Sequence, residues 1–268
     1  MNKKIKMVVT DLDGTLLKND GTVDCKTVDL LVDIQTMGHS VVFATSRHIS
    51  ECKKYAKRIL QENRGYIVAS EGQYICDYRG NVIHTFSFMN TDHLCEIVKE
   101  FNANKLVAVT DGVDYVFSRK RKIADSIFNS VLNLRRGKQR RVILNTVKLR
   151  TANLKIEKMI VHSSDQIKLE STMISKYNIT CLRNGIYEIR NASVDKLYGI
   201  EYLSNYLNID NNNIFVFGND SNDLKMLSSY VNSYAMGNAS MEVLAVAKEV
   251  IDSNQNCGVY WVLRKEFE

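Results

Sequence analysis

The sequence contains no proline, no closely spaced pair of cysteines and no long apolar run. Without proline, its turns depend on Gly, Asn, Asp and Ser, and slow prolyl isomerisation cannot limit its folding. The six cysteines include no Cys-x-x-Cys pair and the five histidines are dispersed, which argues against a zinc site or a redox motif. No apolar stretch approaches the roughly 18 residues that span a bilayer, and only a short strand-like run follows the basic N-terminus. We therefore expect a soluble, cytoplasmic protein that has no membrane partner.

The chain has 268 residues, of which 45% are hydrophobic, enough for a sizeable core or for a main domain with a smaller one. Its net charge of +6 is unevenly distributed, because eleven Lys and Arg residues lie between Arg119 and Arg150 against one acid, Asp125. No aromatic residue interleaves the densest part of this stretch. The pattern favours a solvated face, or a charge that steers an anionic substrate, over nucleic-acid binding.

The first part of the chain alternates strands and helices. Apolar, β-branched runs at 5–10, 40–45 and 66–70 predict buried strands, and amphipathic segments at 24–37 and 49–60 predict helices between them. This order is typical of a parallel sheet with right-handed crossovers.

The pattern changes after the third strand. A hairpin with Arg79-Gly80-Asn81 as its turn is expected within 74–83, and Asn184-Gly185 marks a second hairpin. Between the two hairpins the strands and helices alternate less regularly, which indicates an α+β insert with a mostly antiparallel sheet. The strand candidates are 105–110, 114–118, 156–162, 179–183 and 186–190, and the helix candidates are 91–102, 122–134 and 165–177.

The α/β pattern resumes near the end of the chain. A helix at 194–207, with Ser193 able to cap it, precedes a strand at 214–217. A helix at 221–228, a strand at 232–236, a helix at 240–247 and a strand at 248–251 close the domain. We expect an α/β core formed by residues 1–84 and 189–268, interrupted by a separate domain at 85–188.

Two carboxylates follow the first strand, in the run Asp11-Leu12-Asp13-Gly14-Thr15. Residues at i and i+2 of an extended segment point the same way, so both acids can face one bound group. Asp11 then attacks phosphorus as a nucleophile, and Asp13 serves as general acid and base. The alternative is an ordinary Asx-turn that ends a strand.

Two further segments supply complementary groups. Thr45-Ser46-Arg47 follows the second strand, where a hydroxyl and backbone N–H groups can bind a phosphate oxygen. Lys196 near a helix start is either a surface lysine or the charge that neutralises the nucleophile and the phosphoryl oxygens.

The run Gly218-Asn219-Asp220-Ser221-Asn222-Asp223 follows a strand and is rich in oxygen donors. Such donors suit Mg²⁺, so Asp11, the backbone carbonyl of Asp13 and one group from this run predict a magnesium site. The alternative is a helix N-cap at Asp220 or Ser221.

Taken in order, these segments resemble the haloacid dehalogenase-like (HAD) superfamily of phosphatases, and its Cof-type sugar-phosphatase branch in particular. The resemblance spans essentially the whole chain. It implies a Rossmann-like HAD core with a mostly parallel sheet and an α/β cap inserted between the second and third motifs. It also implies bound Mg²⁺. The roles carried over are nucleophile for Asp11, acid/base for Asp13, phosphate-binding hydroxyl for Thr45 and charge clamp for Lys196.

The resemblance also assigns residues around these. Ser46, Arg47, Gly72 and Asn222 fall at substrate-binding positions, and Asp223 supports the metal site without ligating directly. The sequence departs from the family at Asn219, where an aspartate metal ligand is usual, and Asp220 is the alternative ligand. It departs again at Glu71, where an asparagine is common, and at Ser46, where a glycine is common.

The leading hypothesis is a magnesium-dependent phosphomonoesterase acting on a small phosphorylated metabolite. A phosphotransferase or mutase that uses the same aspartyl-phosphate is an alternative. A catalytically weak phosphate-ligand-binding protein is another, favoured by Asn219 and Glu71.

Overall fold

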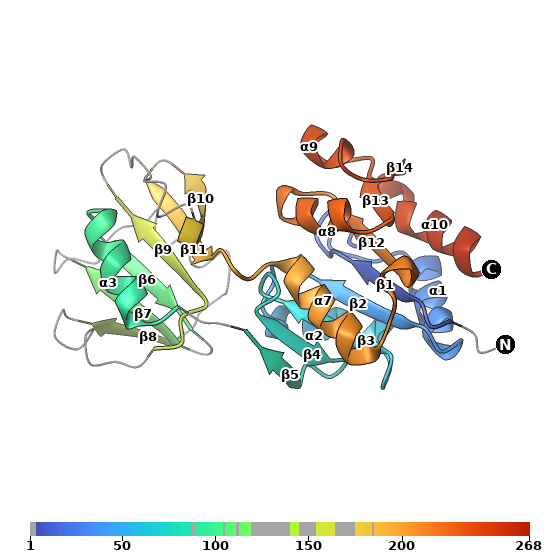
Figure 1. The fold of residues 1–268 in the computed structure, drawn as a ribbon, viewed down its shortest axis with the longest axis horizontal. Coiled ribbons are helices and arrows are strands. Elements are labelled where there is room, and N and C mark those ends of the chain that lie inside the picture. Colours follow the sequence, from blue (N-terminus) through green and yellow to red (C-terminus); the bar gives the residue numbers. More distant parts are fainter. Residues whose placement is uncertain are drawn as a thin grey trace. The chain divides into compact units, whose positions relative to one another are not determined.

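The computed structural model describes residues 4–86, 89–103, 105–110, 113–118, 140–144, 154–163, 175–183 and 185–268. The chain divides into two compact units, the first formed by Met1–Phe86 with Val194–Glu268 and the second by Ser87–Ser193 (Figure 1). The sequence predicts these boundaries at 84/85 and 188/189.

The first unit contains an eight-stranded sheet with the strand order β14-β13-β12-β1-β2-β3-β4-β5. Neighbouring strands are parallel from β14 to β3 and antiparallel from β3 to β5. Its strands are β1 (Met7–Thr10), β2 (Ser40–Ala44), β3 (Gly65–Ala69), β4 (Tyr74–Asp77), β5 (Val82–Thr85), β12 (Ile214–Gly218), β13 (Asn232–Met236) and β14 (Glu249–Ile251). Its helices are α1 (Cys25–Thr36), α2 (Ile49–Ile59), α7 (Lys196–Leu207), η1 (Asn211–Asn213), η2 (Ser221–Asp223), α8 (Leu224–Ser229), α9 (Met241–Leu244), η3 (Asn254–Asn256) and α10 (Gly258–Phe267).

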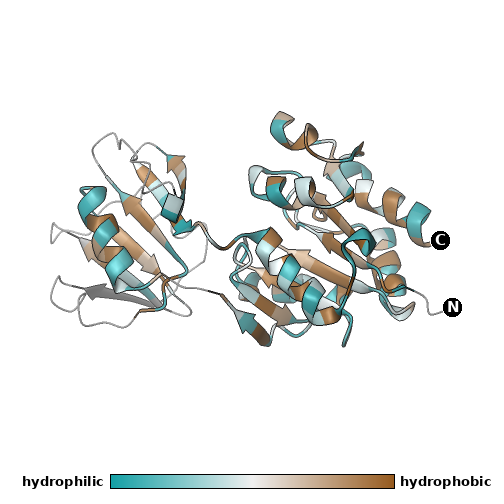
Figure 2. Cartoon of the chain, viewed as in Figure 1, coloured by the Kyte–Doolittle hydropathy of each residue, from teal (hydrophilic) through white to brown (hydrophobic). Residues whose placement is uncertain are grey.

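The central strands are buried on both faces, which explains why they are continuous apolar runs rather than alternating ones. Met7 and Val9 of β1 pack in one cluster with Ile200 of α7 and Met226 of α8. Helix α1 contacts β2, and helix α2 contacts β3. Helix α1 also contacts α10. Figure 2 shows the resulting layer of hydrophobic strands between helices whose outer surfaces are polar.

Three details of the core differ from the sequence prediction. Helix α7 begins at Lys196, and its N-cap is Asp195, whereas Ser193 donates hydrogen bonds to Asn191 Oδ1. The predicted helix at 221–228 is a 3₁₀ turn followed by α8. Helix α10, beyond the last predicted element, packs on α1 and was missed.

The second unit contains a six-stranded sheet with the order β10-β11-β9-β6-β7-β8, antiparallel throughout except for the parallel pair β7–β8. Helix α3 packs on one face of this sheet, where its Leu94 and Ile97 join the apolar cluster. The bounds are α3 (Thr91–Glu100), β6 (Lys105–Val109), β7 (Val113–Ser118), β8 (Arg140–Leu144), β9 (Lys158–His162), β10 (Tyr177–Arg183) and β11 (Ile186–Asn191).

The strand candidates of the insert are confirmed, and β8 is an additional strand that the sequence prediction missed. The helix predicted at 122–134 lies outside the described residues, as does most of the one predicted at 165–177, whose last residue, Tyr177, begins β10. Apart from β8, the basic stretch from Arg119 to Arg150 also lies outside them. The predicted fold class is confirmed: an α/β core with a mostly parallel sheet, and an insert with a mostly antiparallel one. In the part of the chain that is described, each helix is too short or too polar to cross a bilayer.

Candidate active site

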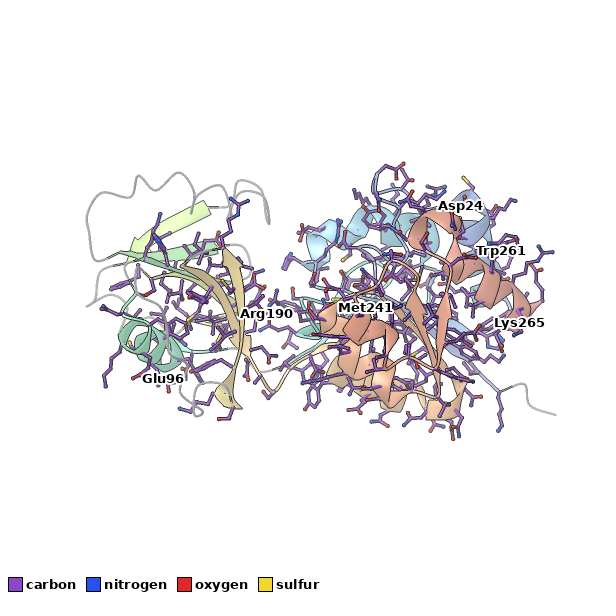
Figure 3. The ribbon with its side chains drawn as sticks, turned by 90° about the horizontal axis from the view of Figure 1, so that it is seen from above. Asp24, Glu96, Arg190, Met241, Trp261 and Lys265 are labelled. Atoms are coloured by element: carbon purple, nitrogen blue, oxygen red, sulfur yellow. The ribbon has the colours of Figure 1, made fainter. Side chains whose placement is uncertain are left out.

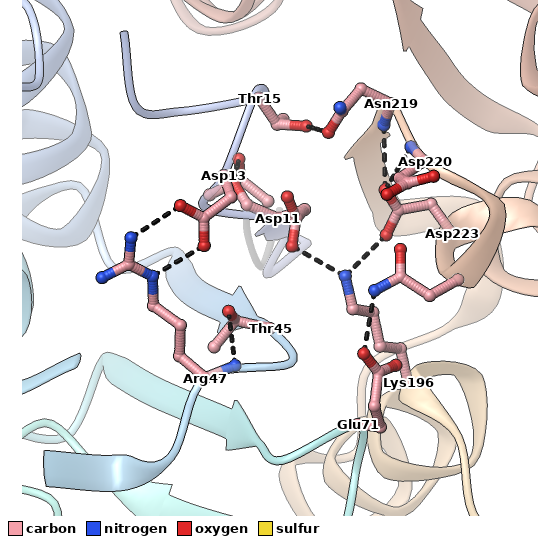
Figure 4. Close-up of polar contacts among 12 residues, drawn as sticks. Asp11, Asp13, Thr15, Thr45, Arg47, Glu71, Lys196, Asn219, Asp220 and Asp223 are labelled. Atoms are coloured by element: carbon pink, nitrogen blue, oxygen red, sulfur yellow. Dashed lines mark hydrogen bonds and ion pairs between the residues drawn. The ribbon is translucent and has the colours of Figure 1, made fainter. Parts of the chain in front are cut away.

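The chemistry-bearing segments meet at the carboxyl ends of three adjacent strands. Thr10, the last residue of β1, pairs with Phe43 of β2 on one side and with Phe217 of β12 on the other. The segments that follow these strands therefore leave the sheet at the same edge, where open α/β sheets bind ligands. Figure 4 shows the resulting cluster, which the first unit alone provides.

Lys196 bridges two buried carboxylates at the centre of this cluster. Its Nζ donates a hydrogen bond to Asp11 Oδ1 and another to Asp223 Oδ1, each 2.7 Å long. The Lys196 side chain is only 1% exposed, so the structure excludes the alternative that it is a surface lysine. Contacts this short between an ammonium and carboxylates are charge-assisted hydrogen bonds.

The start of α7 is held so that Lys196 reaches this position. Asp195 caps the helix by accepting a hydrogen bond from the Tyr198 N–H, and Lys225 forms an ion pair with the Asp195 carboxylate. Gly72, with φ +89°, lies directly against the Asp195 carbonyl, where any Cβ atom would overlap the backbone oxygen. Gly72 thus allows the loop after β3 to touch the first turn of α7.

Burial and neighbouring charge shift the pKa values of Asp11 and Lys196 in opposite directions. Burial raises the pKa of Asp11 to about 7, and the neighbouring Lys196 charge opposes that rise only in part. For Lys196 burial alone would lower the pKa, but Asp11, Asp223 and Glu71 together raise it above its ordinary value. The lysine is therefore a fixed positive charge, and proton uptake at this pair falls on Asp11.

Asp13 has a different environment from Asp11, although only one residue separates them. Its side chain is 55% exposed and accepts two hydrogen bonds of 2.6 Å from Arg47, one from Nε and one from Nη2. This bidentate contact holds the pKa of Arg47 above its ordinary value. The sequence analysis does not predict this pair, because its members are 34 residues apart.

The segment after β2 presents one buried hydroxyl and one exposed one. Thr45 is fully buried, and its Oγ1 accepts a hydrogen bond of 3.1 Å from the Arg47 N–H, which leaves the hydroxyl hydrogen available for donation. Ser46 is exposed. Both lie at the strand end where the sequence places them.

The loop after β12 uses its carboxylates in two different ways. Asp223 is fully buried, with one oxygen on Lys196 and the other accepting the N–H groups of Asn219 and Asp220. Asp220 is exposed, and its side chain caps η2 by accepting the Ser221 N–H at 2.7 Å. Asp220 therefore makes the contact that the capping interpretation predicts, and its role as the alternative metal ligand stays a prediction.

The remaining donors suit a hard divalent cation. Asn219 Oδ1 accepts a hydrogen bond of 2.8 Å from Thr15 Oγ1, in the loop that follows β1 and contains Asp11. Among the described residues, no three His, Cys, Asp or Glu side chains are grouped so as to hold a metal ion. The predicted ligands are the Asp11 carboxylate, the Asn219 amide oxygen and the Asp13 backbone carbonyl. All are oxygen atoms, and they fit a hard divalent cation such as Mg²⁺, which keeps several of its waters. This set supplies one negative charge fewer than a set with two carboxylates.

A second contact that the sequence did not predict joins Asn222 to the loop after β3. Asn222 Nδ2 donates a hydrogen bond of 2.8 Å to Glu71 Oε1. These residues are 151 positions apart, and no local sequence pattern predicts the contact.

Comparisons with known proteins point to one family. The profile of the haloacid dehalogenase-like hydrolases matches residues 8–263. A 5-amino-6-(5-phospho-D-ribitylamino)uracil phosphatase of Bacillus subtilis (strain 168) is 25% identical over 272 residues, covering 100% of this chain and 99% of the relative.

Solved structures share the fold. A haloacid dehalogenase-like hydrolase from Bacteroides thetaiotaomicron superposes with a TM-score of 0.75 at 18% identity, covering 98% of this chain and 100% of that one. A HAD/Cof-like hydrolase from Plasmodium vivax gives a TM-score of 0.73 at 23% identity, covering 99% and 96%. With the profile spanning nearly all of its length, the chain belongs to the haloacid dehalogenase-like hydrolases, as a phosphatase of that superfamily.

Proposed function

We propose that this protein is a magnesium-dependent phosphomonoesterase of the Cof-type branch that hydrolyses a small phosphorylated metabolite through an aspartyl-phosphate on Asp11. The observation that carries the proposal is the buried Lys196 bridging Asp11 and Asp223 with two contacts of 2.7 Å. A buried lysine held on a carboxylate at a strand end neutralises the charge that a phosphoryl group brings to that carboxylate.

In the first half of the reaction, a carboxylate oxygen of Asp11 bonds to phosphorus and the ester P–O bond breaks. The departing alkoxide takes a proton from the carboxyl group of Asp13. Thr45 and Arg47 bind phosphoryl oxygens, because a hydroxyl hydrogen and a guanidinium are the donors at the end of β2.

In the second half, Asp13 takes a proton from water as the water oxygen bonds to phosphorus. The bond between phosphorus and the Asp11 oxygen then breaks, inorganic phosphate leaves and both carboxyl groups are restored. Proton donation requires that Arg47 release Asp13 when substrate binds, since both Asp13 oxygens accept from Arg47 in the structure. The phosphoryl group offers Arg47 an alternative anionic partner.

Family membership implies a divalent cation, which we propose is Mg²⁺. Asp11, the backbone carbonyl of Asp13 and Asn219 are the groups that would hold it. When bound, the cation polarises a phosphoryl oxygen and offsets negative charge in the transition state.

The substrate is proposed to be small because the resemblance gives the insert at 85–188 the role of a cap, and a capped site disfavours large polymeric substrates. The Bacillus subtilis relative acts on a phosphorylated ribitylaminouracil, a metabolite of the proposed size.

The test is phosphate release from a panel of sugar phosphates, polyol phosphates, nucleotides and flavin mononucleotide, with Mg²⁺ and with chelator. We expect release that depends on Mg²⁺ and falls by at least about 10³-fold in Asp11→Asn. Asp33→Asn, the same change on the exposed side of α1, is the matched control and keeps wild-type activity. Wild-type turnover in Asp11→Asn would refute the proposal.

A further inference from the structure

Two asparagines from distant strands hold the loop that carries Asp13. Asn238 follows β13, and its Nδ2 donates a hydrogen bond of 2.8 Å to the Gly14 carbonyl. Asn254 lies in η3, and its Nδ2 donates a hydrogen bond of 2.8 Å to the Leu17 carbonyl. The Asn238 Oδ1 in turn accepts the Asn254 N–H at 3.0 Å, so the two contacts are connected.

The sheet order makes these contacts long-range. In the sheet β12 separates β13 and β14 from β1, and the bonded partners are 224 and 237 positions apart in the sequence. The loop after β13 also contacts the loop after β12, where the Ser240 N–H donates to the Asn219 carbonyl at 3.3 Å. Because these strands are parallel, all of the loops lie at the edge that carries the candidate site.

The partners of Asn238 fix the orientation of its amide. A carbonyl only accepts hydrogen bonds and a backbone N–H only donates them, so the NH₂ group faces Gly14 and the oxygen faces Asn254. The bond from Asn254 to Leu17 is buried, since both residues are at most 5% exposed, and burial strengthens it.

The loop needs support from outside at Gly14. This residue has a φ of +79°, and a Cβ atom on it would lie 2.5 Å from Asn219 Nδ2, so the position requires glycine. Glycine also has the greatest backbone freedom of any residue. The turn therefore depends on contacts such as the one from Asn238 to keep a single conformation.

Asp13 depends on this backbone more than a buried acid would. Its side chain is 55% exposed, and Arg47 donates to both of its oxygens. In the proposed reaction Arg47 turns to the phosphoryl group, and the loop then has to keep Asp13 in place. A displacement of about 1 Å at a reacting group can cost roughly 100-fold in rate.

We infer that Asn238 and Asn254 are positioning residues for the acid/base Asp13. They act through the backbone of its loop, which sets the place of the carboxyl group beside the leaving oxygen. The inference rests on the proposed function, because it gives the two asparagines a role in that reaction. Neither asparagine is among the site residues predicted from the sequence.

The test compares two kinds of leaving group. A p-nitrophenolate departs without a proton, whereas an alkoxide needs one, so alkyl esters depend far more on Asp13. With Mg²⁺ present, kcat/KM is measured for p-nitrophenyl phosphate and for the alkyl ester of the panel that is hydrolysed fastest. This constant does not include the later hydrolysis of the phosphoenzyme.

We expect Asn238→Ala to lower kcat/KM roughly 10- to 100-fold for the alkyl ester and no more than about threefold for p-nitrophenyl phosphate. Asn238 is exposed, so its replacement opens no cavity in the core. Asn238→Asp keeps the acceptor for the Asn254 N–H but cannot donate to Gly14, and it should show the same selective loss.

Asn232→Ala is the matched control. Asn232 lies at the opposite end of β13, where its Nδ2 donates a hydrogen bond of 2.9 Å to the Asn212 carbonyl. The change removes the same kind of bond away from the candidate site. It should lower kcat/KM for the two esters by one common factor or leave both unchanged.

Equal losses for the two esters in Asn238→Ala, or no loss for either, overturn the inference. Asp13→Asn separates this failure from that of the proposed function, which fails if Asp13→Asn spares the alkyl ester or if the wild type hydrolyses no ester. The two asparagines are then judged by hydrogen exchange in chelator. Asn238→Ala should speed exchange roughly fivefold at the Leu16 and Leu17 amides, which donate within the loop, and an unchanged rate would reject their hold on it.

Discussion

Replacing Lys196 by Met should cost the first unit much of its stability. The change removes two charge-assisted hydrogen bonds of 2.7 Å and leaves Asp11 and Asp223, both at least nine-tenths buried, without a cation. Removing one partner of a buried ion pair costs about 3–5 kcal/mol, which lowers the Tm of a unit this size by roughly 10 °C.

The loss should also depend on pH, through Asp11. Its pKa in the folded protein is raised to about 7 from the ordinary 3.8, so the folded state binds the extra proton and its stability falls as the pH rises toward and through 7. In Lys196→Met the pKa of Asp11 rises further, because the lysine charge no longer lowers it. The stability of the variant therefore continues to fall at pH values where that of the wild type has levelled off. We therefore expect a larger deficit at pH 8 than at pH 6.

The chain provides a reporter for this unit alone. Trp261, the only tryptophan, lies on α10 and is half exposed (Figure 3), so its fluorescence follows the unfolding of the first unit. Unfolding is measured in chelator at both pH values, with Lys57→Met on the exposed side of α2 as the control. A Lys196→Met midpoint equal to that of the control at pH 8 would show that the bridge does not stabilise the fold as argued. The double variant Lys196→Met, Asp223→Asn should recover part of the loss, because one buried carboxylate is then neutral.

Other perturbations test separate features. Asn219→Asp should lower the Mg²⁺ concentration for half-maximal activity several-fold, because it adds a charged ligand; an unchanged activation curve would remove Asn219 from the metal site. Hydrogen bonds from Lys176 and Tyr177 lower the pKa of Glu96 from 4.5. Glu96 therefore stabilises the folded second unit above pH 4.5, and this stabilisation is lost as the pH falls through the lowered pKa. Glu96→Gln should reduce hydrogen-exchange protection of α3 at pH 7 by no more than about 1 kcal/mol, and not at low pH; equal effects at both would contradict this. Gly72→Ala should lower the free energy of unfolding of the first unit by about 2 kcal/mol more than a glycine-to-alanine change at a left-handed turn where a Cβ atom has open space. Equal unfolding midpoints for the two variants would contradict the close packing of Gly72 against the Asp195 carbonyl.

The strands of the core could be predicted because burial on both faces leaves a plain signal. The runs at 5–10, 40–45, 66–70 and 214–217 correspond to β1, β2, β3 and β12 with small shifts at their ends. β8 gave no such signal, because it begins with two arginines inside a basic stretch.

The site was predictable in its members but not in their pairing. Asp11, Thr45 and Lys196 lie at or near strand and helix ends that the sequence locates, and topology alone brings them to one edge. The contacts Arg47–Asp13 and Asn222–Glu71 depend on side chains meeting across 34 and 151 residues. Their geometry is decided by tertiary packing, which local propensity does not encode.

The left-handed Ser70 and Glu71 show a similar limit. Neither residue type favours positive φ, and both adopt it because hydrogen bonds to the loop after β2 and the close approach of Gly72 to α7 leave no alternative. The conformational preference of these residues is overridden next to the candidate active site, as is common at functional sites.

The most direct measurement is to identify the group that carries phosphorus during turnover. The enzyme is mixed with Mg²⁺ and a substrate from the panel, quenched in acid within the first turnovers, digested and analysed by mass spectrometry. We predict a phosphoryl group on the peptide that contains Asp11, on its carboxylate, and none in Asp11→Asn. Phosphorylation of a different residue, or phosphate release with no phosphoenzyme at any quench time and full activity in Asp11→Asn, would contradict the account.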